Sequence, residues 1–532
     1  MVTSISVKNY KAFRDATLQI KPLTVLLGAN SVGKSSMLQL LLLLKQTSTF
    51  GSASDKVPLK MYGPFVNMGT TDNLFHNKDN KSILEFSISF KNTSLQMGLN
   101  NLYQDYVQTV STIPYLFPIK ALLEMRNLDR LRDINRAEFY DFTKKIFEIL
   151  EKNKVGDYKQ TLSYMLSRNS LIANDEISMS SLDSIMATYD LLYRIKKLGT
   201  HVKDRADVEY TVSFSFSQKN KKLQICGIRL LSGDKQVFEI DMIKDCRVSS
   251  EFCSFNQLDQ QIIDINIDKS ACIFYCLQDK KRSQEKNSTT LSNYVLKFLS
   301  MALSALKQEF NPNAINHVKP LRANPQRYYV IDDEKLTPYA STLDGERVIE
   351  RLRDDESVRQ MVNKWLGRYN LSINIEQSED VIHHIKIVQN DVELDIPDVG
   401  FGVSQILPIL VQSYCVSKKT LTLIEQPEIH LHPVMQADVA DLFKDAASFD
   451  KPFIIETHSE YLLRRIRRRV AKGELSSNDV AIYMFKGKNS TRDCTEIQHL
   501  EMTATGAFEW PEDFYGGELY NDVIEYIVAQ KS

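Results

Sequence analysis

The sequence predicts an α/β protein whose mostly parallel sheet is assembled from two distant pieces of chain. Residues 23–27 form a nearly continuous apolar run near the N-terminus, and residues 421–424 and 453–455 repeat this pattern near the C-terminus. Such runs suit strands that are covered on both faces. Helical patterns alternate with the strands at both ends, which favours a parallel sheet. The predicted parts are an N-terminal lobe over residues 1–100, an inserted α+β arm, mainly helical, over 101–314, and a C-terminal lobe over 315–532.

Composition excludes several classes of protein. The 532 residues include 66 Lys plus Arg and 67 Asp plus Glu, so a polyanion-binding surface over the whole chain is not indicated, although a local basic patch remains open. No apolar run approaches the roughly 20 residues that span a bilayer, and no signal-peptide core opens the chain. The seven cysteines form no CxxC pair and are interpreted as reduced, buried thiols. We therefore expect a cytoplasmic protein with no membrane association.

Periodicity predicts the remaining elements. Near the N-terminus, two strands at residues 5–7 and 18–20 precede the 23–27 strand, and a helix runs from Ser35 to about Gln46. The strands that begin at about residue 372 include His383 and His384, which we expect at the surface. The insert is predicted to hold helices at 139–154, 158–167, 182–197 and 291–310, and strands at 210–214, 223–231 and 237–243.

A glycine loop follows the first buried strand. Its sequence Gly28-Ala29-Asn30-Ser31-Val32-Gly33-Lys34-Ser35 fits the pattern G-x-x-x-x-G-K-[ST] in full. In this pattern the glycines let backbone N–H groups surround phosphate oxygens, the lysine reaches the β- and γ-phosphates, and the hydroxyl ligates Mg²⁺. The loop also opens a helix, whose N-terminus favours anions. We assign this segment, together with Ser36, to binding ATP and Mg²⁺.

The buried strand at 421–424 ends in acids, with the sequence Glu425-Gln426-Pro427-Glu428. In a P-loop ATPase such a strand supplies the carboxylate that holds Mg²⁺ and often an acid that orients the attacking water. We predict that Glu425, with Ser35, holds the metal. Gln426 occupies the second position and cannot act as a general base, so Gln426 and Glu428 are predicted to orient water.

Histidines provide two further candidates. His458 follows the second C-terminal strand, at the edge where open α/β sheets bind ligands. We weigh a γ-phosphate sensor above an ordinary capping residue at this position. His430 and His432, with Glu428, leave open a metal site. We rank that reading below a role in packing against a partner.

Four stretches together resemble the ABC/SMC-type ATP-binding heads of the AAA ATPases related to OLD-family nucleases and DNA-repair ATPases. The stretches are Asn9-Tyr10-Lys11-Ala12-Phe13 leading to the glycine loop, Asp398-Val399-Gly400-Phe401-Gly402-Val403-Ser404-Gln405, Glu425-Gln426-Pro427-Glu428-Ile429-His430-Leu431-His432-Pro433, and Glu456-Thr457-His458-Ser459-Glu460. A bacterial subgroup shares three further marks, namely Pro320-Leu321-Arg322-Ala323-Asn324-Pro325-Gln326-Arg327-Tyr328-Tyr329, residues 63–69, and Trp510-Pro511-Glu512-Asp513-Phe514. The resemblance covers roughly residues 1–75 and 315–520 and does not extend to the middle of the chain.

The resemblance implies a homodimer in which two heads sandwich two nucleotides. Gly402, Val403, Ser404 and Gln405 would form the signature segment that faces the partner's γ-phosphate, although this segment departs from the usual Leu-Ser-Gly-Gly-Gln. His458 would be the switch histidine. Gln426 stands where many relatives carry the catalytic glutamate, so the resemblance implies either slow hydrolysis or a head that stays closed on ATP as a sensor.

The family likeness also implies a role in bacterial defence against phage. The stretch after His458 is too short for the Toprim nuclease domain of OLD-type relatives, so we expect a separate effector, either a toxin or a nuclease such as the HNH protein of Septu-type systems. An ATP-gated scaffold is ranked first. The alternatives are a DNA-stimulated ATPase or clamp and, third, a nuclease in its own right.

A basic amphipathic helix is predicted at residues 461–470. It carries Arg464, Arg465, Arg467, Arg468 and Arg469 opposite an apolar face. These arginines fit nucleic-acid phosphates, an acidic partner, or acids of the chain's own fold, and the last is given the greatest weight.

Overall fold

The computed structural model describes residues 1–91, 95, 97, 207–277, 290–320, 322, 325–331, 345–379, 381–489, 492–510 and 525–530. The chain forms two compact units. Unit 1 comprises Met1, residues 52–58 and residues 85–307, and unit 2 comprises residues 2–51, 59–84 and 308–532. The helices predicted at 139–154, 158–167 and 182–197 lie outside the described residues.

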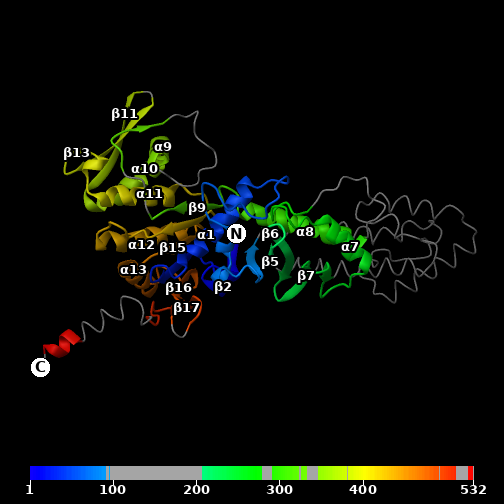
Figure 1. Cartoon of the computed structure of the whole chain (residues 1–532). Coiled ribbons are helices and arrows are strands. Elements are labelled where there is room, and N and C mark those ends of the chain that lie inside the picture. Colours follow the sequence, from blue (N-terminus) through cyan, green and yellow to red (C-terminus); the bar gives the residue numbers. More distant parts are fainter. Residues whose placement is uncertain are drawn as a thin grey trace, which may run out of the picture. The chain divides into compact units, whose positions relative to one another are not determined.

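A six-stranded sheet organises unit 2 (Figure 1), with the strand order β17-β16-β3-β15-β14-β9. Its strands are β3 (Leu23–Gly28), β9 (Ile315–Val318), β14 (Leu421–Glu425), β15 (Phe453–Glu456), β16 (Val480–Lys486) and β17 (Glu496–Leu500). All neighbours are parallel except β17, which runs antiparallel to β16. The N-terminal strand β3 lies between two C-terminal strands. The predicted α/β sheet, assembled from two distant pieces, is therefore confirmed.

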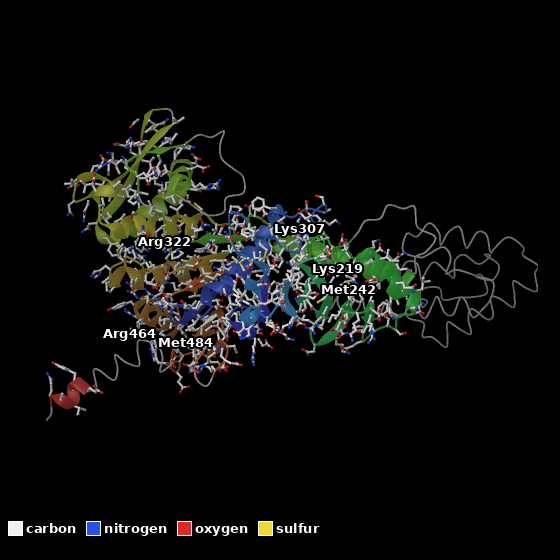
Figure 2. The ribbon with its side chains drawn as sticks, in the orientation of Figure 1. Lys219, Met242, Lys307, Arg322, Arg464 and Met484 are labelled. Carbon is white, nitrogen blue, oxygen red and sulfur yellow. The ribbon has the colours of Figure 1, made fainter. Side chains whose placement is uncertain are left out.

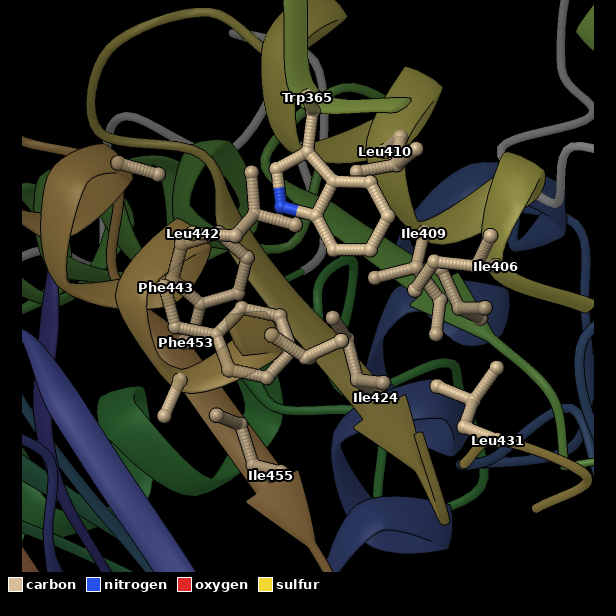
Figure 3. Packing of buried hydrophobic residues seen from close by; sticks show 14 of the residues in the cluster. Trp365, Ile406, Ile409, Leu410, Ile424, Leu431, Leu442, Phe443, Phe453 and Ile455 are labelled. Atoms are coloured by element: carbon tan, nitrogen blue, oxygen red, sulfur yellow. The ribbon is translucent and has the colours of Figure 1, made fainter. Parts of the chain in front are cut away.

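Four helices accompany this sheet in sequence: α1 (Lys34–Phe50), α11 (Phe401–Cys415), α12 (Pro433–Ala447) and α13 (Glu460–Ala471). Helices α12 and α13 pack against each other (Figure 1). The core of the unit joins the strands to α11 and α12, as Figure 3 shows. Phe453 of β15 meets Phe443 of α12 with ring centroids 5.2 Å apart. Each fully buried side chain of this size contributes about 1.5–3 kcal/mol to the stability of the fold. The core therefore holds in place the strand ends that carry the site.

Unit 2 also contains a small antiparallel sheet in which β12 pairs with β10, β11 and β13. Its elements are β10 (Tyr329–Val330), α9 (Gly345–Asp354), α10 (Glu356–Leu366), β11 (Leu371–Glu379), β12 (Ile382–Gln389) and β13 (Val392–Asp395). Trp365 of α10 lies beside Leu410 of α11 (Figure 3). The expectation that His383 lies at the surface is wrong, because its alternate position in β12 points inward and leaves it 1% exposed. Its neighbour His384 remains partly exposed.

The remaining elements of unit 2 are an N-terminal hairpin and several short helices. Strands β1 (Val2–Tyr10) and β2 (Phe13–Gln19) form an antiparallel hairpin. The turn of this hairpin is held by a hydrogen bond to a segment after α1, in which Lys11 N–H donates to the carbonyl oxygen of Leu74 at 2.9 Å. Short 3₁₀ helices complete the unit: η1 (Thr71–Leu74), η2 (His76–Lys78), η6 (Gly367–Tyr369), η7 (Ile396–Asp398) and η8 (Ser477–Asp479).

Unit 1 is built around strands in the order β4-β5-β6-β7-β8, and the neighbours from β5 to β8 pair in antiparallel fashion. Its elements are β4 (Leu84–Lys91), β5 (Asp207–Ser217), β6 (Lys222–Ser232), β7 (Lys235–Asp241), β8 (Arg247–Ser249), α7 (Gln257–Asn266) and α8 (Thr290–Glu309). The strands and the helix predicted for residues 207–310 are confirmed. Lys219, labelled in Figure 2, lies in the exposed turn between β5 and β6.

Two further expectations concern the whole chain. None of the seven cysteines takes part in a disulfide, as predicted; three are buried, namely Cys226, Cys272 and Cys276, and the other four are only partly buried. Within the described ranges, no helix combines the length and apolar character needed to cross a bilayer.

Candidate functional site

The glycine loop joins β3 to α1 and has room only for glycine at its two ends. Gly28 has φ +138°, and a Cβ there would lie 2.5 Å from the carbonyl oxygen of Phe485. Gly33 has φ +101°, and a Cβ there would lie 2.9 Å from Cζ of Phe13. Both the left-handed backbone and the close neighbours therefore require glycine. The spacing of the motif thus has a geometric cause in this fold.

The start of α1 is open to an anion. Gly33 provides no side-chain cap, and the first turn contains no acidic residue. The N–H groups at a helix start lack partners within the helix and carry a partial positive charge. A phosphate at this position would satisfy both features.

Lys34 is buried and folds back into the loop. Its Nζ donates to the carbonyl oxygens of Gly28 at 2.9 Å and Ala29 at 2.7 Å. Nζ also lies 3.7 Å from Oε1 of Glu456. Burial lowers the pKa of Lys34, and the charges of Glu456 and Glu428 oppose this change. The ammonium group is therefore held inside the loop, where an entering phosphate could take over from the carbonyls.

The hydroxyl of Ser35 contacts Glu456, at the end of β15. It donates to Oε2 at 2.9 Å and to Oε1 at 3.2 Å. Burial raises the pKa of Glu456, while Ser35 and Lys34 act to lower it. The sequence paired Ser35 with Glu425, and that assignment stays a prediction. In the structure, the carboxylate that meets Ser35 comes from the neighbouring strand.

Glu425 ends β14 directly beside Glu456, since the two are paired in the parallel register. Its Oε1 lies 2.6 Å from Nε2 of His317, a buried residue of β9. Arg322 donates to the carbonyl oxygens of Glu425 at 3.3 Å and Gln426 at 3.1 Å. Gln426 has φ 45°, an uncommon value for a residue other than glycine. His317 and Arg322 thus support the bend at which β14 ends.

Glu428 links this bend to the end of β15. Its Oε2 accepts from the hydroxyl of Thr457 and its Oε1 from N–H of His458, both at 2.7 Å. Burial raises the pKa of Glu428, with these two hydrogen bonds opposing. Arg322 is also buried, and this lowers its pKa to about 10, with the charge of Glu428 opposing. Both oxygens of Glu428 are therefore engaged, and its predicted role toward water stays a prediction.

His458 lies immediately after β15, as the sequence predicted. Its Nε2 is buried and has no hydrogen-bond partner among the described residues. Burial lowers its pKa, and the positive charge of Lys34 adds to this effect. A largely neutral imidazole with one unsatisfied nitrogen is suited to contact a ligand at this edge of the sheet.

The predicted signature segment, residues 402–405, lies in the first turns of helix α11. A Cβ at Gly402 would lie 3.1 Å from the carbonyl oxygen of His430, so the start of α11 is close to the loop after β14. The side chains of Ser404 and Gln405 are buried. Their predicted contact with the γ-phosphate of a second head stays a prediction.

The histidine pair after β14 does not form a metal cluster. Nδ1 of His432 accepts from N–H of Val434 at 3.4 Å and so caps α12. His430 is exposed, with φ 62°. Within the part of the chain that the structure describes, no three His, Cys, Asp or Glu residues are grouped to hold a metal ion.

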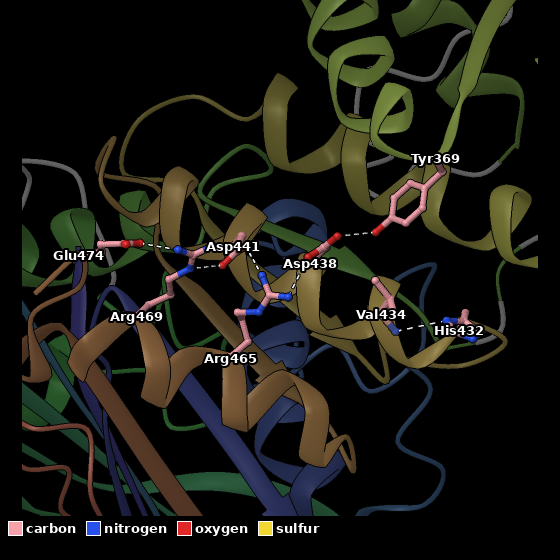
Figure 4. A network of polar contacts seen from close by, with 8 residues as sticks. All are labelled: Tyr369, His432, Val434, Asp438, Asp441, Arg465, Arg469 and Glu474. Atoms are coloured by element: carbon pink, nitrogen blue, oxygen red, sulfur yellow. Dashed lines mark hydrogen bonds and ion pairs between the residues drawn. The ribbon is translucent and has the colours of Figure 1, made fainter. Parts of the chain in front are cut away.

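Two arginines of the basic helix α13 pair with acids of α12 (Figure 4). Arg465 NH1 lies 2.7 Å from Asp441, and its NH2 lies 3.0 Å from Asp438. Arg469 contacts Asp441 through Nε and NH2, both at 2.6 Å, and Glu474 through NH1 at 2.6 Å. These contacts favour the third reading of the helix, in which the arginines meet acids of the chain's own fold.

The other three arginines of α13 have different surroundings. Arg464, labelled in Figure 2, is exposed and pairs with Glu460 at 2.5 Å. Arg467 donates to the carbonyl oxygen of Gly506 at 2.9 Å and lies 5.3 Å from the ring centroids of both Phe508 and Trp510. Arg468 is exposed. Of the five arginines of α13, the exposed ones are thus Arg464 and Arg468.

Sequence reasoning did not assign roles to Glu456, His317 and Arg322. Glu456 had a detectable signal, an acid at the carboxyl end of a buried strand. Arg322 lies in a stretch that contributed to the resemblance, but nothing there indicated its contacts. His317 gave no signal, because only the strand order places it beside Glu425.

The fold and site define a P-loop nucleotide-binding protein of the α/β class. The phosphate loop, the strand-end glutamates and a histidine are brought to one edge of a parallel sheet. The AAA ATPase domain family matches residues 1–463, and the chain belongs to this family. No curated protein matches the chain.

The solved structures similar to the chain include three SMC heads. The SMC head domain from Thermotoga maritima has 8% identity and a TM-score of 0.33, and the match covers 94% of this chain and 99% of that one. An SMC head bound to the C-winged helix domain of ScpA has 10% identity and a TM-score of 0.38, covering 94% and 98%. An Smc head with an extended coiled coil, bound to the C-terminal domain of ScpA from Pyrococcus furiosus, has 12% identity and a TM-score of 0.33, covering 99% of each chain. Because these values are low, the fold assignment rests on the sheet topology.

Proposed function

We propose that this protein is an SMC/ABC-like head that binds and slowly hydrolyses ATP and thereby gates a separate effector protein. The observation that carries the proposal is the convergence of Lys34, Ser35, three glutamates and His458 at one edge of the sheet. That set supplies a phosphate cradle, oxygen ligands and a γ-phosphate contact. The effector would be a nuclease, such as an HNH protein, or a toxin, acting in bacterial defence against phage.

The residues present fit ATP and magnesium. The uncapped start of α1 and the ammonium of Lys34 suit the phosphates. Mg²⁺ prefers oxygen ligands and usually takes one or two carboxylates together with phosphates and waters. The hydroxyl of Ser35 and the neighbouring carboxylates at the ends of β14 and β15 provide such ligands. Bound magnesium would neutralise the negative charge of the phosphates.

The chain's own groups then have distinct tasks in hydrolysis. Lys34 offsets charge on the β- and γ-phosphates, and His458 contacts the γ-phosphate through its unsatisfied nitrogen. Gln426 holds the attacking water by hydrogen bonds, with Glu428 as the nearest acid. Because an amide cannot accept the proton of that water, turnover is expected to be slow.

Two copies of the chain would assemble around ATP. A second copy would offer residues 402–405 of α11 to the nucleotide, so that ATP closes two heads. We keep the division into lobes 1–100 and 315–532 with an arm at 101–314 as part of this proposal. Closure of the heads would reposition the arms and so change how the effector is held.

A second candidate is a DNA-stimulated ATPase or clamp. The observation that favours it is the exposure of Arg464 and Arg468 on α13. Two exposed cations on one helix suit contacts to phosphate backbone. The effector-gating function stands first because Arg465 and Arg469 are already paired with acids of α12.

The test is steady-state ATP turnover and nucleotide binding of the full chain, with and without duplex DNA, beside Lys34→Ala as the blank. We expect the wild type to bind ATP, to turn over slowly and to form dimers with ATP, while Lys34→Ala binds none. Turnover that rises severalfold with DNA would favour the clamp. Normal ATP binding by Lys34→Ala would refute the site.

A further inference from the structure

We propose that Glu456 is a carboxylate of the magnesium site, supplied by the strand between the phosphate-loop strand and the strand that carries Glu425. This inference rests on the proposed ATP·Mg²⁺ function. It adds a metal-site residue from β15 to the pair Ser35 and Glu425 that the motifs predict.

The hydroxyl of Ser35 is directed at Glu456. In a P-loop the hydroxyl of this residue is a ligand of Mg²⁺. Here the hydroxyl meets both oxygens of Glu456, at 2.9 and 3.2 Å. A cation that binds at the Ser35 hydroxyl would therefore have the carboxylate of Glu456 beside it.

The buried charge of Glu456 needs a compensating cation. The side chain of Glu456 is 6% exposed, and a buried carboxylate is stable only with a compensating partner. In the described structure that cation is Lys34, at 3.7 Å. Once Lys34 turns to the phosphates of ATP, Glu456 loses this compensation and faces added negative charge. A divalent cation at Ser35 would restore it.

The order of the strands places Glu456 nearer the phosphate loop than Glu425. Along the sheet, β15 lies between β3, which leads into the phosphate loop, and β14, which carries Glu425. Glu425 is thus one strand farther from the loop and is engaged by His317 on its other side, at 2.6 Å. Glu425 and Glu456 are register partners, so their carboxylates belong to the same edge. Two carboxylates with a hydroxyl is a ligand set suited to Mg²⁺.

The alternative is that Glu456 only ties the empty phosphate loop in place. The two roles differ in their dependence on metal. If Glu456 only stabilised the loop, its loss would change the affinity for nucleotide equally with and without Mg²⁺. Loss of a metal carboxylate would raise the Mg²⁺ requirement and leave metal-free binding unchanged or tighter, because a negative charge near the phosphates is removed.

The experiment measures binding of a fluorescent, non-hydrolysable ATP analogue to the full chain, first in EDTA and then over a Mg²⁺ titration. For Glu456→Gln we expect unchanged or tighter binding in EDTA and a half-saturating Mg²⁺ concentration raised at least about 10-fold. Electron paramagnetic resonance of Mn²⁺ with the same analogue should show weaker metal binding by a similar factor. Glu460→Gln, which changes the nearby acid paired with Arg464, is the matched control and should behave as wild type.

Two results would overturn the proposal. One is a Glu456→Gln titration that superimposes on wild type; the other is an equal loss of affinity in EDTA and in Mg²⁺. Glu456→Asp keeps the charge but has a shorter side chain, so it should raise the Mg²⁺ requirement by a smaller factor than Glu456→Gln. If Glu456→Gln does not fold, an unchanged Mg²⁺ requirement in Glu456→Asp also overturns the proposal. Failure of the ATP function itself would show separately, as a wild type that binds no analogue or a Lys34→Ala variant that binds normally.

Discussion

Asp441 of α12 is expected to be a large single contributor to the stability of unit 2. It accepts three hydrogen bonds from Arg465 and Arg469, at 2.6–2.7 Å, and its side chain is 8% exposed. Removing one partner of a buried ion pair costs about 3–5 kcal/mol. The two arginines are 20% and 21% exposed and keep contacts to Asp438 and Glu474, so part of that cost is recovered. We expect Asp441→Ala to lose about 2–3 kcal/mol of unfolding free energy.

The assay is urea unfolding followed by tryptophan fluorescence. The chain has two tryptophans, Trp365 and Trp510, and both belong to unit 2. Trp365 is buried in the core, and Trp510 lies against Arg467 of α13. The signal therefore reports on the unit that contains the mutation. With a slope of about 3 kcal/mol per molar urea, the midpoint should fall by about 0.7–1 M.

The matched control is Asp445→Ala on the same helix. Asp445 pairs with Lys444 at 2.8 Å but is 56% exposed, and exposed pairs contribute about 0–1 kcal/mol. The midpoint of the control should shift by no more than about 0.3 M. If Asp441→Ala unfolded at the same urea concentration as Asp445→Ala, the inference that α12 and α13 are joined by this ion-pair network would be refuted.

The same network predicts a dependence on pH. Burial alone would raise the pKa of Asp441, but the hydrogen bonds and charges of Arg469 and Arg465 outweigh burial and hold the pKa below its usual value. A carboxyl with a lowered folded-state pKa contributes stability above its unfolded value of about 3.9 and loses it as pH falls through the folded value. The stability gap between wild type and Asp441→Asn should be constant from pH 7 to about 5 and close below about pH 4.

Two predictions concern turnover and DNA. Gln426→Glu should raise ATP turnover severalfold if the missing base limits hydrolysis; an unchanged rate would mean that Glu428 or another acid already serves. Arg464→Glu with Arg468→Glu should weaken DNA binding and lower the salt slope by at most about 2, one unit for each phosphate that is no longer neutralised. An unchanged slope would mean that these two arginines do not contact DNA phosphates.

The class of fold could be predicted because its signals are local. Buried parallel strands are nearly continuous in apolar residues, and the runs at 23–27 and 421–424 show this directly. The glycine loop was equally accessible, since its spacing encodes a backbone geometry. Gly28 and Gly33 adopt φ values of +138° and +101° that other residues rarely take.

The fate of single side chains was less predictable. His383 and His384 are adjacent polar residues and read as a surface pair, yet one position of every two in a strand faces inward. For the five arginines of α13, sequence reasoning gave the greatest weight to pairing with acids of the chain's own fold but could not name those acids. Their partners Asp438 and Asp441 are about 25 residues earlier, on another helix, so only the packing of α12 on α13 reveals the pairing.

The acid that meets Ser35 shows the same limit at the centre of the site. Both Glu425 and Glu456 end buried strands, so motif position alone favours Glu425, the acid in the longer motif. Which carboxylate lies nearer the phosphate loop depends on which strand is inserted beside β3, and strand order is a property of the whole sheet. Since β15 takes that place, Glu456 meets both Lys34 and Ser35, while Glu425 meets His317. The residue that follows Glu425 is the uncharged Gln426, so the carboxylate of β15 has more weight in the electrostatics of this site.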